Sequence, residues 1–198
     1  MLRETVIKIE RLSRKYKGYI STEELLREGI TNRQIGVFVE IEILERVCHG
    51  YYWFNCSVRA KPPDHKALEV CFSDPEAVIC ADSACFYLGL IDVEPVSLSA
   101  ATRRSDRRRI HMNFPVSRHY YSERLFPEYQ KTVETEFGTY RIYDIERSVC
   151  DCIRFREDLE DDIFAYVLEC YKKRNPAGDK LLEYAKNLRL LKLVKQYV

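Results

Sequence analysis

Residues 20–35, ISTEELLREGITNRQI, contain two consecutive helix-start signals, which together predict a helix-turn-helix. In the first signal, Ser21 caps the helix backbone and Glu24 reaches back to the cap residue. The second signal repeats this pattern, with Thr31 as the cap and Gln34 as its partner. The glycine between them favours the left-handed conformation that ends a helix without a steric cost. The stretch therefore predicts two short helices joined by a tight turn.

The flanking segments complete a larger motif. Before the pair, residues 4–17 place apolar side chains at helical spacing and predict a supporting helix. After the pair, residues 43–54, ILERVCHGYYWF, contain two β-prone runs separated at His49-Gly50, as a hairpin requires. Three helices and a hairpin predict a winged helix.

A winged helix typically presents its second motif helix to DNA, where polar side chains at the helix start meet base edges or phosphates. Residues 1–60 contain 10 Lys and Arg against 8 Asp and Glu, so their basic surface is local. Because helix-turn-helix pairs also dock proteins, a docking module is the alternative to the DNA binding that we favour. The candidate DNA-binding residues are Thr31, Asn32, Arg33 and Gln34 at the helix start and Arg46 and His49 in the wing.

Length and composition indicate a folded protein of two domains. The chain has 198 residues, a net charge of +1 and 46% hydrophobic residues, which excludes disorder and a broadly polycationic protein. A Pro62-Pro63 pair interrupts the periodicity within residues 57–64 and predicts the domain boundary there. We therefore expect a winged-helix DNA-binding domain over 1–60 and a second domain over 61–198.

The apolar residues bear on the compartment of the protein, and the cysteines bear on metal binding. No run of about 18 apolar residues occurs and no signal peptide precedes the first domain, so we expect a cytoplasmic protein without a membrane partner. The eight cysteines form no C-x-x-C pair and have no histidine at ligand spacing, so the sequence predicts no metal site and no cofactor. Most of them lie in apolar runs, as small buried hydrophobic residues do.

The second domain alternates strand and helix patterns and ends in three helices. A hairpin is expected where two strands flank Gly138-Thr139. The whole pattern predicts an α+β fold, with the N-terminal winged helix-turn-helix followed by a mixed α/β domain with C-terminal helices. The predicted helices span 65–72, 82–88, 145–156, 162–174 and 179–196, and the predicted strands span 77–80, 96–99, 109–115, 129–137 and 140–143.

Four motifs occur in order along nearly the whole chain. They are the helix-turn-helix, LERVCHGYY at 44–52, AVICADSA at 77–84 followed by Gly89-Leu90, and DIERSVCD at 144–151. Together they resemble the AbiEi family, which are abortive-infection antitoxins of type IV toxin–antitoxin systems in phage defence. The resemblance implies a winged helix that binds inverted repeats in promoter DNA and represses its own operon. It also implies a C-terminal antitoxin domain that counteracts a cognate nucleotidyltransferase-like toxin.

The resemblance makes Ser83, Arg147 and Asp151 motif residues of the second domain. Arg147 and Asp151 are one helical turn apart, so an ion pair between them is geometrically possible. Asp144 precedes the same helix and can cap its start. A structural network explains this pattern without any ligand, and we favour it over a binding site.

Residues 103–109, RRSDRRR, form the densest charge run, with five arginines against one aspartate. Blocks of like charge often mark interaction segments, and arginine matches phosphate in a bidentate manner. Two interpretations stay open. The run is either a solvated loop or a contact surface, and the partner of such a surface would be DNA, the toxin or RNA bound by the toxin. The candidate polyanion or partner contacts are Arg103, Arg104, Arg107, Arg108 and Arg109.

Patterns that indicate catalysis are weak. The seven glycines form no phosphate-binding loop, and no histidine lies near a nucleophile in a strand-turn-helix context. Asp82, Glu94, Glu134 and Glu136 could serve as carboxylates of a nuclease-like domain, but no strand lysine follows at close spacing. We therefore expect a repressor and antitoxin and not an enzyme. The alternatives are a plain winged-helix transcriptional regulator without a toxin partner and, less favoured, a nuclease-like enzyme.

Overall fold

The computed structural model describes residues 2–56 and 59–197 and contains helices and two β-sheets in a mixed α+β arrangement. Its contacts divide the chain into two compact units. The first unit extends to Ser73 and also includes His111–Asn113 and Glu134–Thr139, and the segments Asp74–Ile110, Phe114–Val133 and those from Tyr140 onward form the second. In the part of the chain that is described, no helix is both long enough and apolar enough to cross a membrane.

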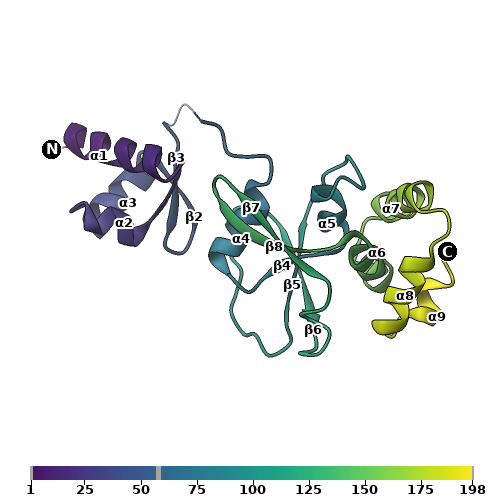
Figure 1. The fold of residues 1–198 in the computed structure, drawn as a ribbon. Helices are drawn as coiled ribbons and strands as arrows, with labels where there is room; N and C mark the ends of the chain where they lie inside the picture. Colours follow the sequence, from purple (N-terminus) through teal and green to yellow (C-terminus); the bar gives the residue numbers. More distant parts are fainter. Residues whose placement is uncertain (1, 57–58, 198) are drawn as a thin grey trace. The chain divides into compact units, whose positions relative to one another are not determined.

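Helices and a three-stranded antiparallel sheet with strand order β1-β3-β2 make up most of the first unit (Figure 1). Its elements are α1 (Leu2–Lys15), β1 (Tyr19–Ser21), α2 (Thr22–Arg27), α3 (Asn32–Glu40), β2 (Leu44–Cys48), β3 (Tyr51–Phe54) and α4 (His65–Ser73).

Both predicted helix starts are present with reciprocal caps. At α2, the Glu24 amide donates to Ser21 Oγ at 3.2 Å, and the Ser21 amide donates to the Glu24 carboxylate at 2.8 Å. At α3, the Gln34 amide donates to Thr31 Oγ1 at 3.3 Å, and the Thr31 amide donates to Gln34 Oε1 at 2.9 Å. Each box satisfies two amide groups that a helix start would otherwise leave without partners.

The turn between α2 and α3 follows from the glycine that ends α2. Gly29 has φ +77° and donates its amide to the Leu26 carbonyl at 2.9 Å. The next amide, of Ile30, donates to the Leu25 carbonyl at 3.0 Å. This pair of bonds is the Schellman motif, which directs the chain sharply into the next helix start.

Strand β3 has buried side chains on both of its faces. Tyr52 and Phe54 pack into one cluster, and Tyr51 and Trp53 pack into another, because side chains alternate along a strand. Phe72 of α4 stacks on Tyr51, with ring centroids 4.8 Å apart. The helical cluster that receives Tyr52 and Phe54 includes Ile9, Leu12, Ile20, Leu25, Ile30, Ile35, Phe38 and Leu44.

Polar contacts also attach α4 to the first unit. The buried Glu69 carboxylate accepts a hydrogen bond from the Tyr19 hydroxyl at 3.0 Å and pairs with Lys61 at 2.8 Å. Lys61 pairs with Glu45 of β2 as well. The unit therefore continues to Ser73, beyond the boundary predicted after residue 60. Ser57 and Val58, at the start of the predicted linker, lie outside the described residues.

The second sheet has strand order β6-β5-β4-β8-β7, in which β4 pairs antiparallel with β5 and parallel with β8, while β5 and β6 are parallel. Helices α6 to α9 lie together beside this sheet (Figure 1). The elements are β4 (Val78–Ile79), α5 (Ala81–Tyr87), β5 (Leu98–Arg103), β6 (Val116–Tyr121), β7 (Gln130–Thr135), β8 (Gly138–Tyr143), α6 (Ile145–Arg154), the 3-10 turn η1 (Arg156–Asp158), α7 (Asp161–Arg174), α8 (Asp179–Asn187) and α9 (Leu191–Val194).

The strand predicted over 109–115 is wrong. This segment pairs with no strand, and β6 begins at Val116 opposite Leu98 of β5. Its alternating apolar side chains are only partly buried, and Pro115 has no amide hydrogen to donate to a ladder. Alternation therefore identified an extended connection with one sheltered side, not a paired strand.

Other predicted elements are present with shifted bounds, such as the strand predicted over 96–99, which is β5 at Leu98–Arg103. The helix predicted over 179–196 breaks into α8 and α9 because Arg189 has φ +62° and the Leu190 amide donates back to the Ala185 carbonyl at 2.7 Å. This is a helix-ending motif without its usual glycine. The predicted hairpin exists, but its turn is Glu136-Phe137, and Gly138 is already the first residue of β8.

Replacing Gly18 should destabilise the first unit. Its φ is +104°, and a Cβ atom there would lie 2.2 Å from Cζ3 of Trp53. We expect Gly18→Ala to lower the free energy of unfolding by about 2–4 kcal/mol, through overpacking and backbone strain. Denaturant unfolding measures the difference. Gly36→Ala is the matched control, because Gly36 lies within α3 with no atom within 4 Å of such a Cβ. It should stabilise by about 0.5–1 kcal/mol, and equal effects of the two changes would contradict this packing.

Candidate nucleic-acid interface

The start of α3 presents polar side chains to solvent. Thr31, Asn32 and Arg33 are exposed, and Gln34 is half-buried. Because Gln34 Oε1 already accepts from the Thr31 amide and hydroxyl, its NH₂ group is the part that the cap leaves for a ligand. Ile35 and the following Phe38 face the core. The side chains at this helix start thus divide into a capping pair, Thr31 and Gln34, and an exposed pair, Asn32 and Arg33.

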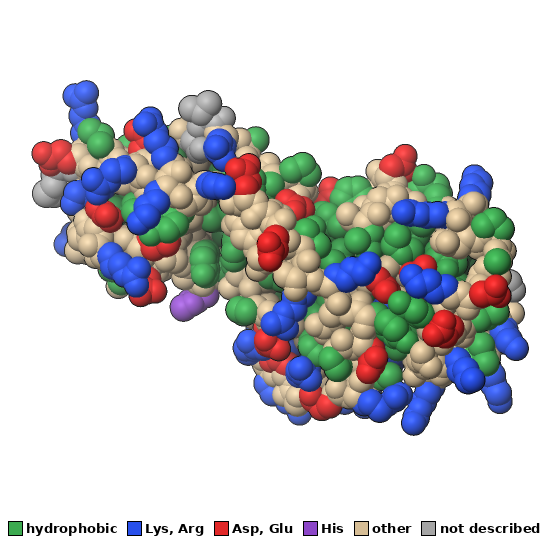
Figure 2. All heavy atoms as spheres, viewed as in Figure 1, with side chains coloured by type: hydrophobic (Ala, Val, Ile, Leu, Met, Phe, Trp, Pro, Cys, Tyr) green, Lys and Arg blue, Asp and Glu red, His purple; other side chains and the backbone are tan. Residues whose placement is uncertain are grey.

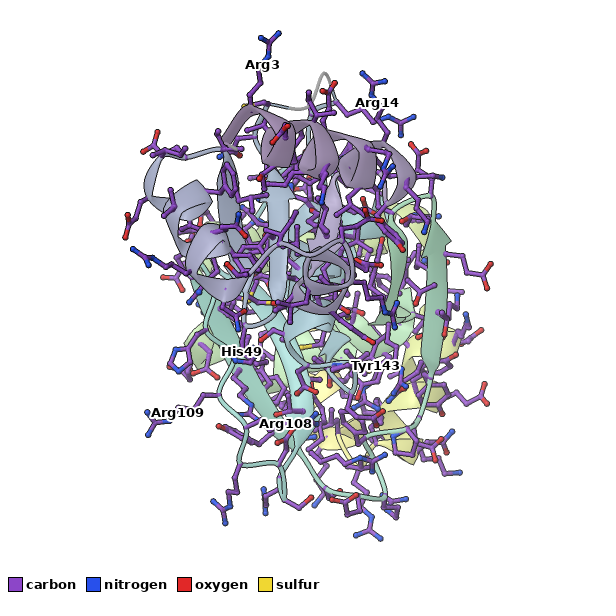
Figure 3. The ribbon with its side chains drawn as sticks, turned by 90° about the vertical axis from the view of Figure 1, so that its left-hand side faces the viewer. Arg3, Arg14, His49, Arg108, Arg109 and Tyr143 are labelled. Carbon is purple, nitrogen blue, oxygen red and sulfur yellow. The ribbon has the colours of Figure 1, made fainter. Side chains whose placement is uncertain are left out.

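Arg33 differs from other arginines of the first unit in its partners. Arg11 pairs with Glu28, the residue that follows α2, while Arg14 and Arg27 pair with glutamates on α1 and α2. Within the described residues, Arg33 forms no ion pair. Figure 2 shows Lys and Arg side chains mixed with Asp and Glu over the visible face around α1, and Arg3 and Arg14 project from α1 in Figure 3. Arg3 and Arg46 also form no ion pair among the described residues, so Arg33 is one of several unpaired arginines of this unit and the one that lies at the α3 start.

The hairpin β2–β3 holds the two predicted wing residues. Arg46 is exposed on β2, and its guanidinium lies 5.8 Å from the centre of the Tyr52 ring. His49 is exposed in the turn, next to Gly50 with φ +85°. The Thr22 amide donates to the Gly50 carbonyl at 2.8 Å, which fixes the hairpin turn beside the first residue of α2.

The arginine run divides into paired and unpaired side chains. Arg103 pairs with Glu123 at 2.6 Å. Arg108 pairs with Asp74 and with Asp106, each at 2.9 Å, and its guanidinium lowers the pKa of the Asp106 carboxyl to about 2. Among the described residues, the exposed guanidinium groups of Arg104, Arg107 and Arg109 have no acidic partner, and Arg109 projects away from the ribbon in Figure 3.

The motif residues Arg147 and Asp151 form a buried ion pair on α6, as predicted. Arg147 Nε donates to Asp151 Oδ2 at 2.9 Å, and both side chains are almost completely excluded from solvent. The Arg147 guanidinium also donates to the Leu125 carbonyl at 3.1 Å and lies 4.3 Å from the Tyr143 ring centre. Asp144 caps α6 by accepting from the Arg147 amide at 3.0 Å. Burial raises the pKa of the Asp151 carboxyl, while the adjacent guanidinium acts in the opposite direction.

Ser83 belongs to a buried polar network that attaches α5 to β5. Its hydroxyl accepts from the Ser99 amide at 2.9 Å, and Asp82 Oδ1 accepts from the Ser99 hydroxyl at 2.7 Å. His119 Nε2 lies 3.4 Å from Ser99 Oγ, and burial lowers the pKa of this imidazole. Because Ser99 donates its proton to Asp82 and not to His119, this is not the arrangement of an activated nucleophile.

The remaining predictions concern metals and carboxylates. In residues 2–56 and 59–197, no group of three His, Cys, Asp or Glu side chains is placed to hold a metal ion. Asp82 lies in the polar network just described, and Glu136 pairs with Lys17 at 3.3 Å and Arg59 at 3.2 Å. Cys48, Cys71, Cys80, Cys85, Cys150 and Cys152 are buried thiols.

Two residues beside the arginine run were not identified from the sequence. Arg118 and Tyr120 lie on β6 on the side opposite the buried His119 and Tyr121, and Tyr120 keeps 46% of its surface exposed. Val116, Tyr120 and Tyr121 are residue types enriched in strands and are the available signal for β6, whereas hydrophobic alternation favours the neighbouring segment 109–115.

No protein-family profile and no curated protein matches this chain. Among solved structures, the chain is similar to the crystal structure of the RV2827C protein from Mycobacterium tuberculosis, with a TM-score of 0.59 at 13% sequence identity. The superposition covers 94% of this chain and 69% of that chain. At such low identity, the similarity shows the fold alone, a mixed α+β arrangement with two sheets.

Removing one partner of the Arg147–Asp151 pair should destabilise the second unit more than replacing both partners with apolar residues. Arg147→Met leaves a buried carboxylate unpaired and should lower the free energy of unfolding by about 3–5 kcal/mol. The double change Arg147→Met/Asp151→Leu should recover more than half of that loss. The exposed pair of Arg14 with Glu10 is the control, and Arg14→Met should cost less than about 1 kcal/mol. Additive losses in the double variant, measured by denaturant unfolding, would contradict the coupling.

Proposed function

We propose that the chain is a DNA-binding antitoxin of the AbiEi type, with a winged helix that represses its own promoter and a second unit that counteracts a nucleotidyltransferase-like toxin. The observation that carries the DNA-binding half is the start of α3. There, a reciprocal cap fixes the backbone while Asn32 and Arg33 stay exposed, and Arg33 has no ion-pair partner among the described residues. Recognition helices contact base edges through such N-terminal polar side chains.

The surrounding geometry supports the same proposal. A supporting helix, two short helices and the β2–β3 hairpin follow one another in the order of a winged helix. The hairpin supplies Arg46 and His49 as exposed groups that would contact phosphates, and its turn is fixed to α2 through Thr22. With few unpaired charges on this unit, specificity would come from a small number of direct contacts.

The antitoxin half of the proposal depends on the resemblance of the sequence motifs. Ser83, Arg147 and Asp151 all lie in the interior, where they join α5 and α6 to their neighbours. They therefore supply stability to the second unit, and the surface that opposes the toxin would consist of other residues. The alternative is a plain regulator without a toxin partner, and a neutralisation assay distinguishes it from an antitoxin.

The first functional prediction concerns promoter binding. Arg33→Ala should weaken binding to the promoter inverted repeats by about 1–3 kcal/mol, because a bidentate base contact is lost. A fluorescence-anisotropy titration at fixed salt, with a scrambled duplex as competitor, measures both affinity and specificity. Arg14→Ala is the matched control, since Arg14 is an exposed arginine of the same unit that pairs with Glu10. If both variants bind the promoter as tightly as the parent, α3 does not read DNA.

The second functional prediction separates repression from neutralisation. Because the first unit includes His111–Asn113 and Glu134–Thr139, cutting the chain at residue 60 would remove part of that unit, so full-length variants are preferable. Cells that express the toxin should grow when they also express the full chain carrying Arg33→Ala, at protein levels equal to the parent. Loss of growth with this variant would show that toxin neutralisation depends on DNA binding. If the parent protein itself gives no protection, the plain regulator is favoured.

A further inference from the structure

A basic groove lies in the second unit, beside the edge strand β6. Five arginines, one aspartate and one tyrosine line it, and its volume is about 590 Å³. The lining residues are Arg104, Asp106, Arg107, Arg108, Arg109, Arg118 and Tyr120. Five positive charges face one negative charge in the lining, and Asp74 pairs with Arg108 from outside it, so the arginine groove keeps a net positive charge that attracts polyanions.

The loop that carries these arginines is held in place by internal contacts. Arg118 donates from Nε to Thr102 Oγ1 at 2.7 Å and from Nη2 to the Asp106 carbonyl at 3.3 Å, and its Nη1 donates to the Arg108 carbonyl. Asp106 in turn holds the Arg108 side chain with two oxygens. Arg118 and Arg108 thus fix the loop conformation before any ligand arrives.

The arginines not used by the loop are free to meet a ligand. Arg104, Arg107 and Arg109 are exposed and, in the described part of the chain, unpaired with any carboxylate. Beside them, Tyr120 is 46% exposed, and the Arg118 guanidinium lies 4.9 Å from the centre of its ring. The groove therefore combines unpaired guanidinium groups with one exposed aromatic ring.

The geometry points to a binding site for single-stranded nucleic acid, in which Arg104, Arg107 and Arg109 contact phosphates and Tyr120 stacks on a base. Single-strand binders combine a basic groove with aromatic side chains on which bases stack. An acidic protein partner fits less well, because protein interfaces have apolar cores and Tyr120 is the one aromatic or aliphatic residue among the described residues that line this groove. A duplex fits less well because its bases are already stacked and the groove offers no helix to its major groove.

This site is separate from the proposed promoter contact on α3, and the test keeps the two apart by using full-length protein that carries Arg33→Ala throughout. The probes are labelled single strands of RNA and DNA of about 12 nucleotides, within the usual site sizes, and the matching DNA duplex. In that background we compare Tyr120→Ala, Tyr120→Phe, the double change Arg107→Ala/Arg109→Ala, and Arg124→Ala, an exposed arginine outside the groove. Circular dichroism melts check that each variant is folded.

We expect Tyr120→Ala to weaken single-strand binding by about 5- to 150-fold, while Tyr120→Phe keeps the stacking ring and binds like the parent. The double arginine change should reduce the slope of log affinity against log salt by about 0.7 for each lost phosphate contact, and Arg124→Ala should leave it unchanged. Tighter binding of RNA or of DNA identifies which strand is the ligand, and either result supports the site.

Three results would overturn the proposal. The first is binding of the duplex as tight as binding of the single strands, and the second is full affinity in Tyr120→Ala. The third is unchanged nucleic-acid binding in the double arginine variant together with lost toxin neutralisation, which would make the groove a contact for an acidic protein. None of these results bears on promoter binding through Arg33, because all measurements are made without that side chain.

Discussion

Burial of both faces of β3 is the constraint on which the first unit depends. Tyr52 and Phe54 complete the helical core, while Trp53 and Tyr51 pack against Tyr19 and Phe72. A strand in this position leaves no broad face for a ligand, so the hairpin can contact a partner only through its turn and its edge residues. The same constraint requires glycine at position 18, where any side chain would overlap the Trp53 ring. The helices are positioned by this strand, and the exposed start of α3 follows from that arrangement.

The helix starts and the α6 ion pair could be predicted because their signals are local. A capping box joins residues three apart, and Arg147 and Asp151 are four apart, so the sequence contains both partners side by side. The break between α8 and α9 gave no such signal, because Arg189 occupies a left-handed position that glycine usually marks. The strand at 109–115 was misplaced for a different reason. Alternation reports which side is sheltered, whereas pairing depends on a partner far along the chain.

The same distinction between local and distant partners limits how far the arginine run at 103–109 could be interpreted from the sequence. Seven residues with five guanidinium groups look alike in sequence, yet Arg103 and Arg108 are paired while three others are not. Of the partners that decide this, Asp106 lies within the run, whereas Glu123 lies 20 residues from Arg103 and Asp74 lies 34 residues from Arg108. Run length therefore could not separate a solvated loop from a binding surface, because the distinction depends on tertiary contacts.

The acidic residues near the arginine groove decide which of its arginines are fixed and which are available to a ligand. Asp106 and Asp74 neutralise Arg108 but also fix it, and Arg118 is held by backbone carbonyls, so these two side chains lose their freedom during folding. A ligand that meets Arg104, Arg107 and Arg109 then orders three side chains and not the whole loop. Ordering costs subtract directly from affinity. A preformed loop with a few unpaired guanidinium groups can therefore bind a flexible polyanion more tightly than a longer but mobile run of the same charge.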